Sequence, residues 1–377
     1  MLLSFDGSNG EEPFAGLTLA PSGLLYGTTE RGGANGAGTV FQITPDGLLT
    51  TLHSFDVTDG LNPLAGVVQA FNGMLYGTTK LGGANDQGAV FQIGLDGALT
   101  TLHSFKGIGR YLTEPAGLVQ STDGILYGTT LGIGAYGHGS VYTITPDGTF
   151  AILYSFDGAD GAGPLSALIQ GSDGNLYGTT GGGGTHDFGT VFRISPAGAL
   201  TTLHNFNGLD GATPQGALTE GSDGNFYGTA PAGGAKGYGT VFQITPSGVL
   251  TTLHAFDNTD GANPFGGLVQ GTDGNFYGTT YRDGPGGQGT VFRLSVGLGP
   301  FVKAIPGFGA PGSTVKILGS NLTDANNVTF NGAAAAFTIS SANLITATIP
   351  AGATTGQIHV SLPDGTVSSN APFRVVP

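Results

Sequence analysis

Histidine, tyrosine and aspartate side chains occur in several short glycine-rich segments of the sequence. Five of them are His138, His186, Tyr136, Tyr238 and Asp187. Imidazole, phenol and carboxylate groups can donate or abstract a proton, which is the basis of general acid–base catalysis. These residues therefore form a candidate catalytic set for a polysaccharide lyase or a glycoside hydrolase, provided that the fold brings their segments together.

A larger group of polar and aromatic residues occupies the same segments and the loops between them. Aromatic rings can stack on sugars, and cations or amides can bind hydroxyl and carboxylate groups. The candidate ligand-binding residues are Arg31, Gln87, Lys106, Arg110, Tyr111, Tyr136, His138, His186, Phe188, Lys236, Tyr238, Tyr281, Arg282 and Gln288. The alternative interpretation is a solvated loop surface without a ligand, and the absence of tryptophan from the chain weakens the sugar interpretation.

Pairs of aspartates three residues apart precede a glycine at three places in the chain. These residues are Asp56 with Asp59, Asp157 with Asp160, and Asp257 with Asp260. Several oxygens from one loop could begin a calcium shell, but the alternating ligands and terminal Glu of an EF-hand are missing. Asp and Gly also shape turns by binding backbone N–H groups. We expect turn formation, with Ca²⁺ binding as the alternative, and no other cofactor.

Four further histidines stand in a recurring Leu-His-x-Phe phrase. They are His53, His103, His204 and His254, and Tyr154 takes the same place in another copy of the phrase. Because each copy belongs to a different repeat, the four imidazoles are too far apart to share one metal ion. We expect each of them to pack or to form hydrogen bonds within its own repeat.

The composition limits the classes of protein to which the chain can belong. Its 377 residues include 72 glycines and 20 prolines, which excludes a helical fold. A net charge of −14 disfavours nucleic acid as a partner, and the lack of cysteine excludes disulfides and thiolate chemistry. No apolar run reaches the roughly 18 residues of a membrane span. The first residues lack the basic and apolar regions of a signal peptide, so none is present in this chain.

One phrase organises most of the sequence. Leu25-Tyr26-Gly27-Thr28-Thr29 recurs with its tyrosine at Tyr76, Tyr127, Tyr177, Tyr227 and Tyr277, in steps of 50 or 51 residues. In the fifth copy, four β-type runs cover 216–221, 226–229, 240–245 and 250–256, and turn residues separate them. Six such units predict an all-β fold, a six-bladed β-propeller over residues 1–297. Residues 2–6 match a fourth strand, so we expect them to close the last blade by pairing with residues 290–295.

After residue 297 the repeat ends and a different pattern begins. Alternating β-type runs cover residues 313–318, 327–330, 344–349 and 357–362. This pattern predicts a small Ig-like β-sandwich over residues 300–377.

Two family resemblances accompany these patterns. The unit Ser222-Asp223-Gly224-Asn225-Phe226-Tyr227-Gly228-Thr229, followed by 239–246 and 250–254, resembles the GloVer repeat of bacterial choice-of-anchor surface proteins. Residues 306–315, 319–322, 328–332 and 350–356 resemble an IPT/TIG domain of Ig type. These resemblances imply an exported or cell-surface protein, and they supply no catalytic residue.

Function is expected on the propeller face that carries the long loops, because the glycine-rich and acidic loops emerge there and differ most between units. We expect a non-catalytic protein, secreted or on the cell surface, that binds a glycan or another surface component. One alternative is a polysaccharide-active enzyme on the same face. Another is a structural subunit that associates with itself through its C-terminal domain.

Overall fold

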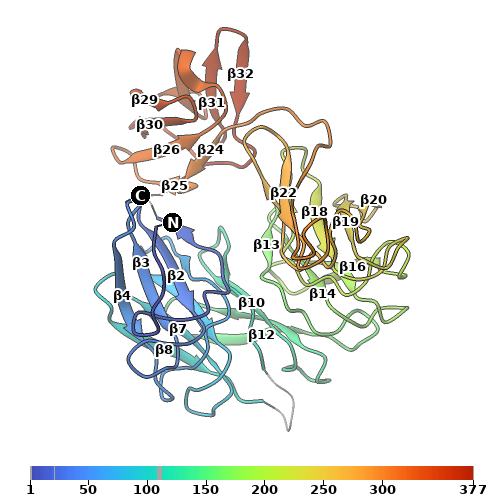
Figure 1. Ribbon diagram of the computed structural model, residues 1–377. Coiled ribbons are helices and arrows are strands. Elements are labelled where there is room, and N and C mark those ends of the chain that lie inside the picture. The colour runs from blue at the N-terminus through green and yellow to red at the C-terminus, as the bar shows by residue number, and fades with distance from the viewer. Residues whose placement is uncertain (1, 21, 108–112, 377) are drawn as a thin grey trace.

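The computed structural model describes residues 2–20, 22–107 and 113–376, and this part of the chain is built from β-strands and one short 3₁₀ helix. Five four-stranded antiparallel sheets and one three-stranded sheet follow one another between Thr18 and Leu294. Each sheet holds one of the repeated tyrosines, and we number the sheets as units 1 to 6 in chain order. Figure 1 shows the units succeeding one another along a curved path.

Units 1 to 3 share one strand pattern. Their strands are β1 (Thr18–Leu19), β2 (Leu25–Thr29), β3 (Thr39–Ile43), β4 (Leu49–Ser54), β5 (Val68–Gln69), β6 (Leu75–Thr79), β7 (Ala89–Ile93), β8 (Leu99–Ser104), β9 (Val119–Gln120), β10 (Leu126–Thr130), β11 (Ser140–Ile144) and β12 (Phe150–Ser155).

Units 4 to 6 continue the pattern. Their strands are β13 (Ile169–Gln170), β14 (Leu176–Thr180), β15 (Thr190–Ile194), β16 (Leu200–Asn205), β17 (Thr219–Glu220), β18 (Phe226–Ala230), β19 (Thr240–Ile244), β20 (Leu250–Ala255), β21 (Val269–Gln270), β22 (Phe276–Thr279) and β23 (Val291–Leu294). The four runs predicted for the fifth copy are therefore strands, although the first one is only two residues long.

The recurring Tyr-Gly-Thr step fits one cross-strand contact. In unit 5, Gly228 of β18 lies opposite Phe242 of β19, and a Cβ on this glycine would come within 2.6 Å of the phenylalanine ring. The glycine thus leaves room for the aromatic ring. The neighbouring tyrosine is fixed by the preceding turn, as in unit 4, where the Tyr177 hydroxyl donates to Asp173 at 2.8 Å. Burial and this hydrogen bond raise the pKa of Tyr177 to about 12.

Consecutive units are joined by apolar packing and by side-chain hydrogen bonds. The ring of Tyr177 in unit 4 stacks on Phe226 in unit 5, with 3.9 Å between ring centroids. At the end of the innermost strand, the Gln270 side chain accepts a hydrogen bond of 2.9 Å from the backbone N–H of Ser222 in the preceding unit. Each unit therefore depends on its neighbours for a buried apolar face.

The C-terminal strands form separate sheets around their own core. They are β24 (Lys303–Ile305), β25 (Phe308–Gly309), β26 (Thr314–Leu318), β27 (Asn327–Phe330), β28 (Ala333–Ala334), β29 (Phe337–Ser341), β30 (Leu344–Thr348), β31 (Ile358–Leu362), β32 (Gly365–Ser368) and β33 (Arg374–Val375), with the 3₁₀ helix η1 (Leu322–Asp324). Two four-stranded sheets, β24-β26-β30-β29 and β28-β27-β31-β32, enclose a cluster that includes Ile317, Val328 and Ile345. The four runs predicted beyond residue 297 all lie in these strands.

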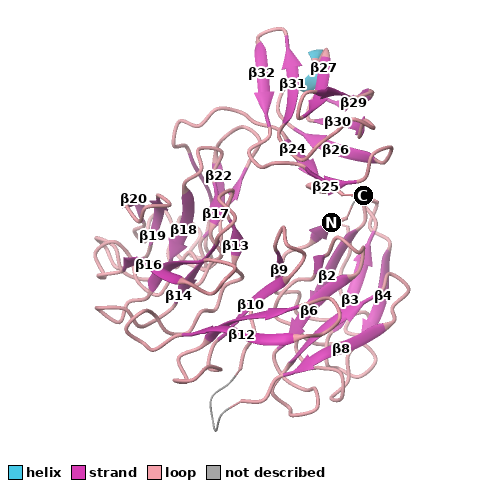
Figure 2. Ribbon diagram, turned by 180° about the vertical axis from the view of Figure 1, so that it is seen from behind, coloured by secondary structure: helices cyan, strands magenta, loops and turns pink. Residues whose placement is uncertain are grey.

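The C-terminal sheets contact unit 6 and unit 2 of the repeat array. The backbone N–H of Phe301 donates to Thr272 O of unit 6 at 3.1 Å, and the ring of Phe308 packs edge-on against Phe71 of unit 2 at 4.9 Å. Figure 2 shows these sheets between the two ends of the curved path. No helix in the described part of the chain has the length and hydrophobicity to cross a membrane.

The predicted closure of the last sheet is wrong. Among the described residues, β23 pairs with β22 alone, and residues 2–6 form no strand with residues 290–295. Residues 2–5 lie instead against unit 1, where the Phe5 ring contacts Phe41 at 5.3 Å. The physical reason is that the C-terminal sheets bind units 2 and 6 at once and keep unit 6 apart from unit 1 (Figure 1).

Candidate functional site

The acidic loops, which lead from the fourth strand of one unit to the next unit, are held by their own carboxylates. Asp56 Oδ1 accepts hydrogen bonds from the Thr58 backbone N–H at 2.7 Å and from its hydroxyl, and Asp59 Oδ1 accepts the Asp56 N–H at 2.9 Å. The bonds from the Thr58 hydroxyl and backbone N–H lower the pKa of Asp56. The loops at Asp157, Asp160, Asp257 and Asp260 repeat this arrangement.

The second aspartate of these loops also binds the side chain of the preceding strand. His53 Nε2 lies 2.7 Å from Asp59 Oδ2, and the pairs His204–Asp210 and His254–Asp260 are 2.8 Å apart. Tyr154 donates to Asp160 in the same way. The carboxylates proposed as calcium ligands are thus engaged in turns and pairs, and the described residues contain no group of three or more metal-binding side chains.

His103 is the exception in this series. Its ring stacks flat on Phe150, with 3.8 Å between centroids and an interplanar angle of 5°. It also packs edge-on against Phe105. Burial lowers the pKa of the His103 imidazole below its ordinary value. All four histidines of the recurring phrase therefore pack or form hydrogen bonds, although His103 stacks on a ring of the next unit and not only within its own repeat as predicted.

The variable residue of the Gly-x-Gly segment lies where each glycine-rich loop meets the next acidic loop. The carbonyls of His138, Phe188 and Tyr238 accept backbone N–H groups of Gly163, Thr213 and Asn263 at 2.8 to 2.9 Å. The Gln87 carbonyl accepts the Thr113 hydroxyl. These contacts place consecutive loops side by side on one face of the repeat array, which we call the loop face.

Most of the predicted cations on the loop face lie beside acids. Arg31 lies 3.5 Å from Glu12, Lys80 lies 2.7 Å from Glu114, and Arg282 lies 3.9 Å from Asp283. Lys106, Lys236 and Gln288 are exposed. Arg110 and Tyr111 lie outside the described residues. The loop face is therefore a mixed polar surface without a concentrated positive patch.

The structure does not assemble the predicted catalytic set into a hydrogen-bonded group. Asp187 Oδ1 accepts the Gly183 N–H of its own loop at 2.9 Å, and His186 Nδ1 lies 2.9 Å from the Thr185 hydroxyl. Tyr136 is 65% exposed. Among the described residues, no hydrogen bond or ion pair joins any two of the five side chains.

All six units contribute to a hollow of about 480 Å³ at the centre of the loop face. Small residues at the start of the innermost strands, such as Ala65, Gly117 and Ala217, leave this space open, and Leu165, Gln215 and Phe265 also line it. Tyr281, a predicted ligand-binding residue, packs edge-on against Phe265 at 5.7 Å. Tyr281 is 73% exposed and Phe265 is 43% exposed, so this aromatic pair stands at the rim.

A second hollow of about 390 Å³ adjoins the first, because Leu165 and Gln215 line both. His138 lies at its edge, together with Leu131 and five glycines. Of the predicted catalytic residues, His138 is therefore the one that borders this hollow.

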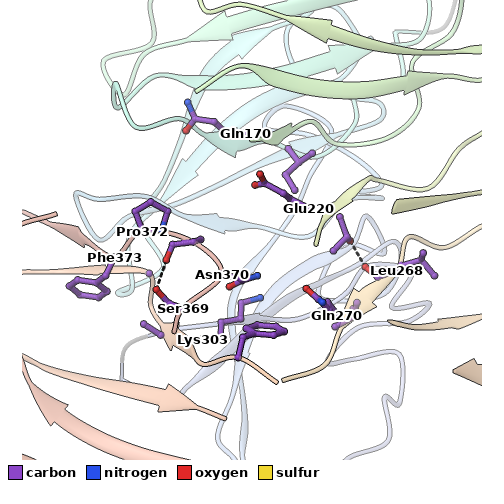
Figure 3. A pocket seen from close by; sticks show the side chains of 16 residues that line it. Gln170, Glu220, Leu268, Gln270, Lys303, Ser369, Asn370, Pro372 and Phe373 are labelled. Carbon is purple, nitrogen blue, oxygen red and sulfur yellow. Dashed lines mark hydrogen bonds between the residues drawn. The ribbon is translucent and has the colours of Figure 1, made fainter. Parts of the chain in front are cut away.

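Another cavity, of about 450 Å³, lies between the repeat units and the C-terminal sheets. Figure 3 shows Gln170, Glu220 and Gln270 on one side and Lys303 and Asn370 on the other. The first three side chains bind turns of the preceding units, as Glu220 binds Ser172 N at 3.1 Å. These three side chains thus already have structural partners, and all six units line the central hollow of the loop face, so we take that hollow as the candidate site.

Sequence reasoning missed Phe265, Leu165 and Gln215. They occupy one position of the repeat, directly after a proline, where the other units have Phe14, Leu64 and Pro115. Variation at a single position within a constant phrase was the available signal, the same one that identified the Gly-x-Gly residue.

Solved structures place the chain in a class of repeated all-β proteins. It is similar to the extracellular domain of a protein assigned as a hybrid two-component system from Bacteroides thetaiotaomicron, with a TM-score of 0.51 and 12% identity over 96% of this chain and 50% of that one. The chain thus spans half the length of that structure. A gluconolactonase from Xanthomonas campestris gives a TM-score of 0.47 and 14% identity over 77% and 88% of the two chains. These neighbours are propeller-like.

The chain itself belongs to the Gloeobacter/Verrucomicrobia repeat family, whose profile matches residues 1–171 and 113–342. This match confirms the resemblance of the repeat. No curated protein sequence matches the chain.

Proposed function

We propose that the chain is a six-bladed propeller over residues 1–297 followed by an Ig-like sandwich of IPT/TIG type over residues 300–377. Support comes from the six successive sheets and from the separate core around Ile317 and Val328. The first five blades have four strands each, and the sixth has three. Residues 2–6 do not serve as a closing strand of the sixth blade.

We further propose that the protein is exported and acts as a non-catalytic binding protein for a glycan at the central hollow of the loop face. The observation that carries this proposal is the exposed pair Tyr281 and Phe265 at the rim of a hollow to which all six units contribute. A sugar ring that stacks on one of these aromatic faces would remove apolar surface from water. Gln215, which lines both hollows, and His138, which lines the adjoining one, offer hydrogen bonds to hydroxyl groups.

The charges around the hollow favour a neutral or weakly charged glycan. Glu114 lines the hollow and is neutralised by Lys80 at 2.7 Å, and Arg282 beside Tyr281 lies near Asp283. Since the described cations nearest the hollow, Lys80 and Arg282, lie beside acids, a densely anionic polymer would gain little from them.

A glycan array followed by calorimetry tests this function. We expect neutral oligosaccharides to bind, and Tyr281→Ala and Phe265→Ala to weaken binding about tenfold or more while the fold is kept, because both rings are already solvent-exposed. Val249→Ala provides the control, since Val249 is 63% exposed in the turn between β19 and β20 at the opposite ends of the strands.

Product assays separate binding from catalysis. If the natural chain releases reducing ends or unsaturated sugars from a polysaccharide and His138→Ala does not, the protein is an enzyme and not only a binding protein. Secretion is tested by fractionating cells of the source organism, where the protein is expected outside the inner membrane.

A further inference from the structure

Consecutive units share one apolar interface that is repeated along the array. We call the side of a unit that is turned toward the next unit its following face, and the side turned toward the previous unit its preceding face. Tyr227 and Val241 on the following face of unit 5 pack against Leu268 and Phe276 on the preceding face of unit 6. Tyr227 and Phe276 stack with 4.0 Å between ring centroids. All four side chains are at least 96% buried, so separating the two units would expose apolar surface on both faces to water.

At the two ends of the array, apolar residues of these same faces are exposed. On unit 6, Tyr277, Val269 and Val291 are 36%, 65% and 81% exposed, whereas Tyr227 and Val241 in unit 5 are fully buried. On unit 1, Leu17 is 51% exposed, whereas the equivalent Leu268 is 4% exposed. Contiguous apolar exposure of this kind marks an interaction surface.

These two open faces are complementary by construction. In units 1 to 5, the following face is covered by the preceding face of the next unit. Unit 6 has such a following face, and unit 1 has such a preceding face. The β23 edge also lacks the fourth strand that the other five sheets have. An unpaired strand edge is a template for a strand from another chain.

Residues 2–5 already occupy the place of that missing strand, but on unit 1. Phe5 contacts Phe41 at 5.3 Å, as Phe206, directly after the fourth strand of unit 4, contacts Phe242 of unit 5 at 5.3 Å. The carbonyl of Leu2 approaches Gly47 as that of Leu203 approaches Gly248, in each case 2.6 Å from where a Cβ would be. Residues 2–5 thus lie against unit 1 as the end of a fourth strand lies against the next unit.

The C-terminal sheets keep these faces apart within one molecule. They bind Thr272 of unit 6 through Phe301 and Ser320, and they bind Phe71 of unit 2 through Phe308 and the Arg374 guanidinium, 4.1 Å from the ring centroid. Val291 of unit 6 and Leu17 of unit 1 stay exposed, whereas Val269 and Tyr277 line hollows that unit 6 shares with the C-terminal sheets.

We propose that a second copy of this chain docks the preceding face of its unit 1, with residues 2–5, onto the following face of unit 6. The strand register of unit 5, in which Val241 lies opposite His254, then places Leu3 of one molecule opposite Val291 of the other. Such head-to-tail contacts use two different surfaces and leave each molecule with a free face, so they generate rings or filaments. This association uses other residues than the loop-face hollow and does not rest on the glycan-binding function.

Light scattering over a range of protein concentrations tests the association. We expect the mass to rise with concentration, and Val291→Asp or Leu17→Asp to hold the chain as a monomer with an unchanged melting temperature, because both side chains are exposed in the single molecule. Val249→Asp is the matched control and is expected to associate like the natural chain. A monomer at every concentration, or equal association of all four proteins, overturns the proposal.

Cross-linking identifies the occupant of the open face, because the chain has no cysteine of its own. Residues opposite each other in paired strands are close enough for a disulfide. Mixing Leu3→Cys with Val291→Cys protein under oxidation is expected to give a covalent dimer. In the double variant Leu3→Cys, Val291→Cys at high dilution, the two cysteines of one chain are expected to remain unlinked. A link inside one chain, or no dimer in the mixture, rules out docking of a second copy in this register.

Discussion

The side-chain oxygen of Gln170 in unit 4 accepts a hydrogen bond of 2.9 Å from the backbone N–H of Thr122 in unit 3. Its amide nitrogen donates to Ser121 Oγ at 2.6 Å. Gln120, Glu220 and Gln270 bind the turn of their preceding unit in the same way. One polar residue in each of units 3 to 6 thus joins its unit to the preceding one. Gln170, Glu220 and Gln270 also line the cavity between the repeat units and the C-terminal sheets.

Replacement of this residue should loosen the contact between units. Gln170→Met keeps the size of the side chain and removes its hydrogen bonds, so we expect a loss of about 1 kcal/mol of stability. Thermal unfolding followed by circular dichroism measures the effect. Gln288→Met, in an exposed loop position, is the control and should leave the melting temperature unchanged.

The histidine that precedes each acidic loop should be replaceable by tyrosine. His204 of unit 4 binds Asp210 at 2.8 Å, and Tyr154 of unit 3 makes the equivalent contact with Asp160. We expect His204→Tyr to retain the stability of the natural chain and His204→Phe to lose about 1 kcal/mol, since phenylalanine packs but cannot bind the carboxylate. Equal stability of the two variants would show that the hydrogen bond contributes nothing.

Stability should depend on pH through His103. Its pKa is lowered by burial, so the unfolded chain binds a proton more readily than the folded chain. The contribution of the neutral, stacked imidazole is therefore present above the unfolded pKa of about 6.5 and is lost as the pH falls through the lower folded value. We expect His103→Phe to show a smaller decrease in melting temperature than the natural chain between pH 7.5 and 5.5. An identical decrease would contradict this assignment.

A methyl group in the Tyr-Gly-Thr step should disrupt its unit. In Gly178→Ala the new Cβ would lie 2.7 Å from both Phe192 and Leu168, and both side chains are in the packed interior. Overpacking of this kind costs about 1 to 3 kcal/mol. Gly286→Ala is the matched control, because nothing lies within 4 Å of its Cβ position and its φ is not positive. The two melting temperatures give the comparison.

Part of the candidate site could have been found in the sequence. His53 and Asp59 were singled out separately, and the constant spacing of six residues, kept by Tyr154 and Asp160, was a signal that they form a pair. The Gly-x-Gly position led to His138, which borders a hollow, but not to Phe265 or Gln215. The proximity of these residues depends on how six units are arranged around one centre, which no single unit encodes.

The sequence by itself determined the units, their strands and turns, and the break after residue 297, because these features follow from local alternation, glycine and turn residues. Only the tertiary structure decided that residues 2–5 lie on unit 1, that β23 keeps an open edge, and that the C-terminal sheets lie between the ends of the array. Those outcomes depend on the summed rotation between units and on contacts such as Phe71 with Phe308, whose residues are far apart in the chain. The repeated sequence determines the interface between consecutive units, but it does not determine what contacts the exposed face of unit 6.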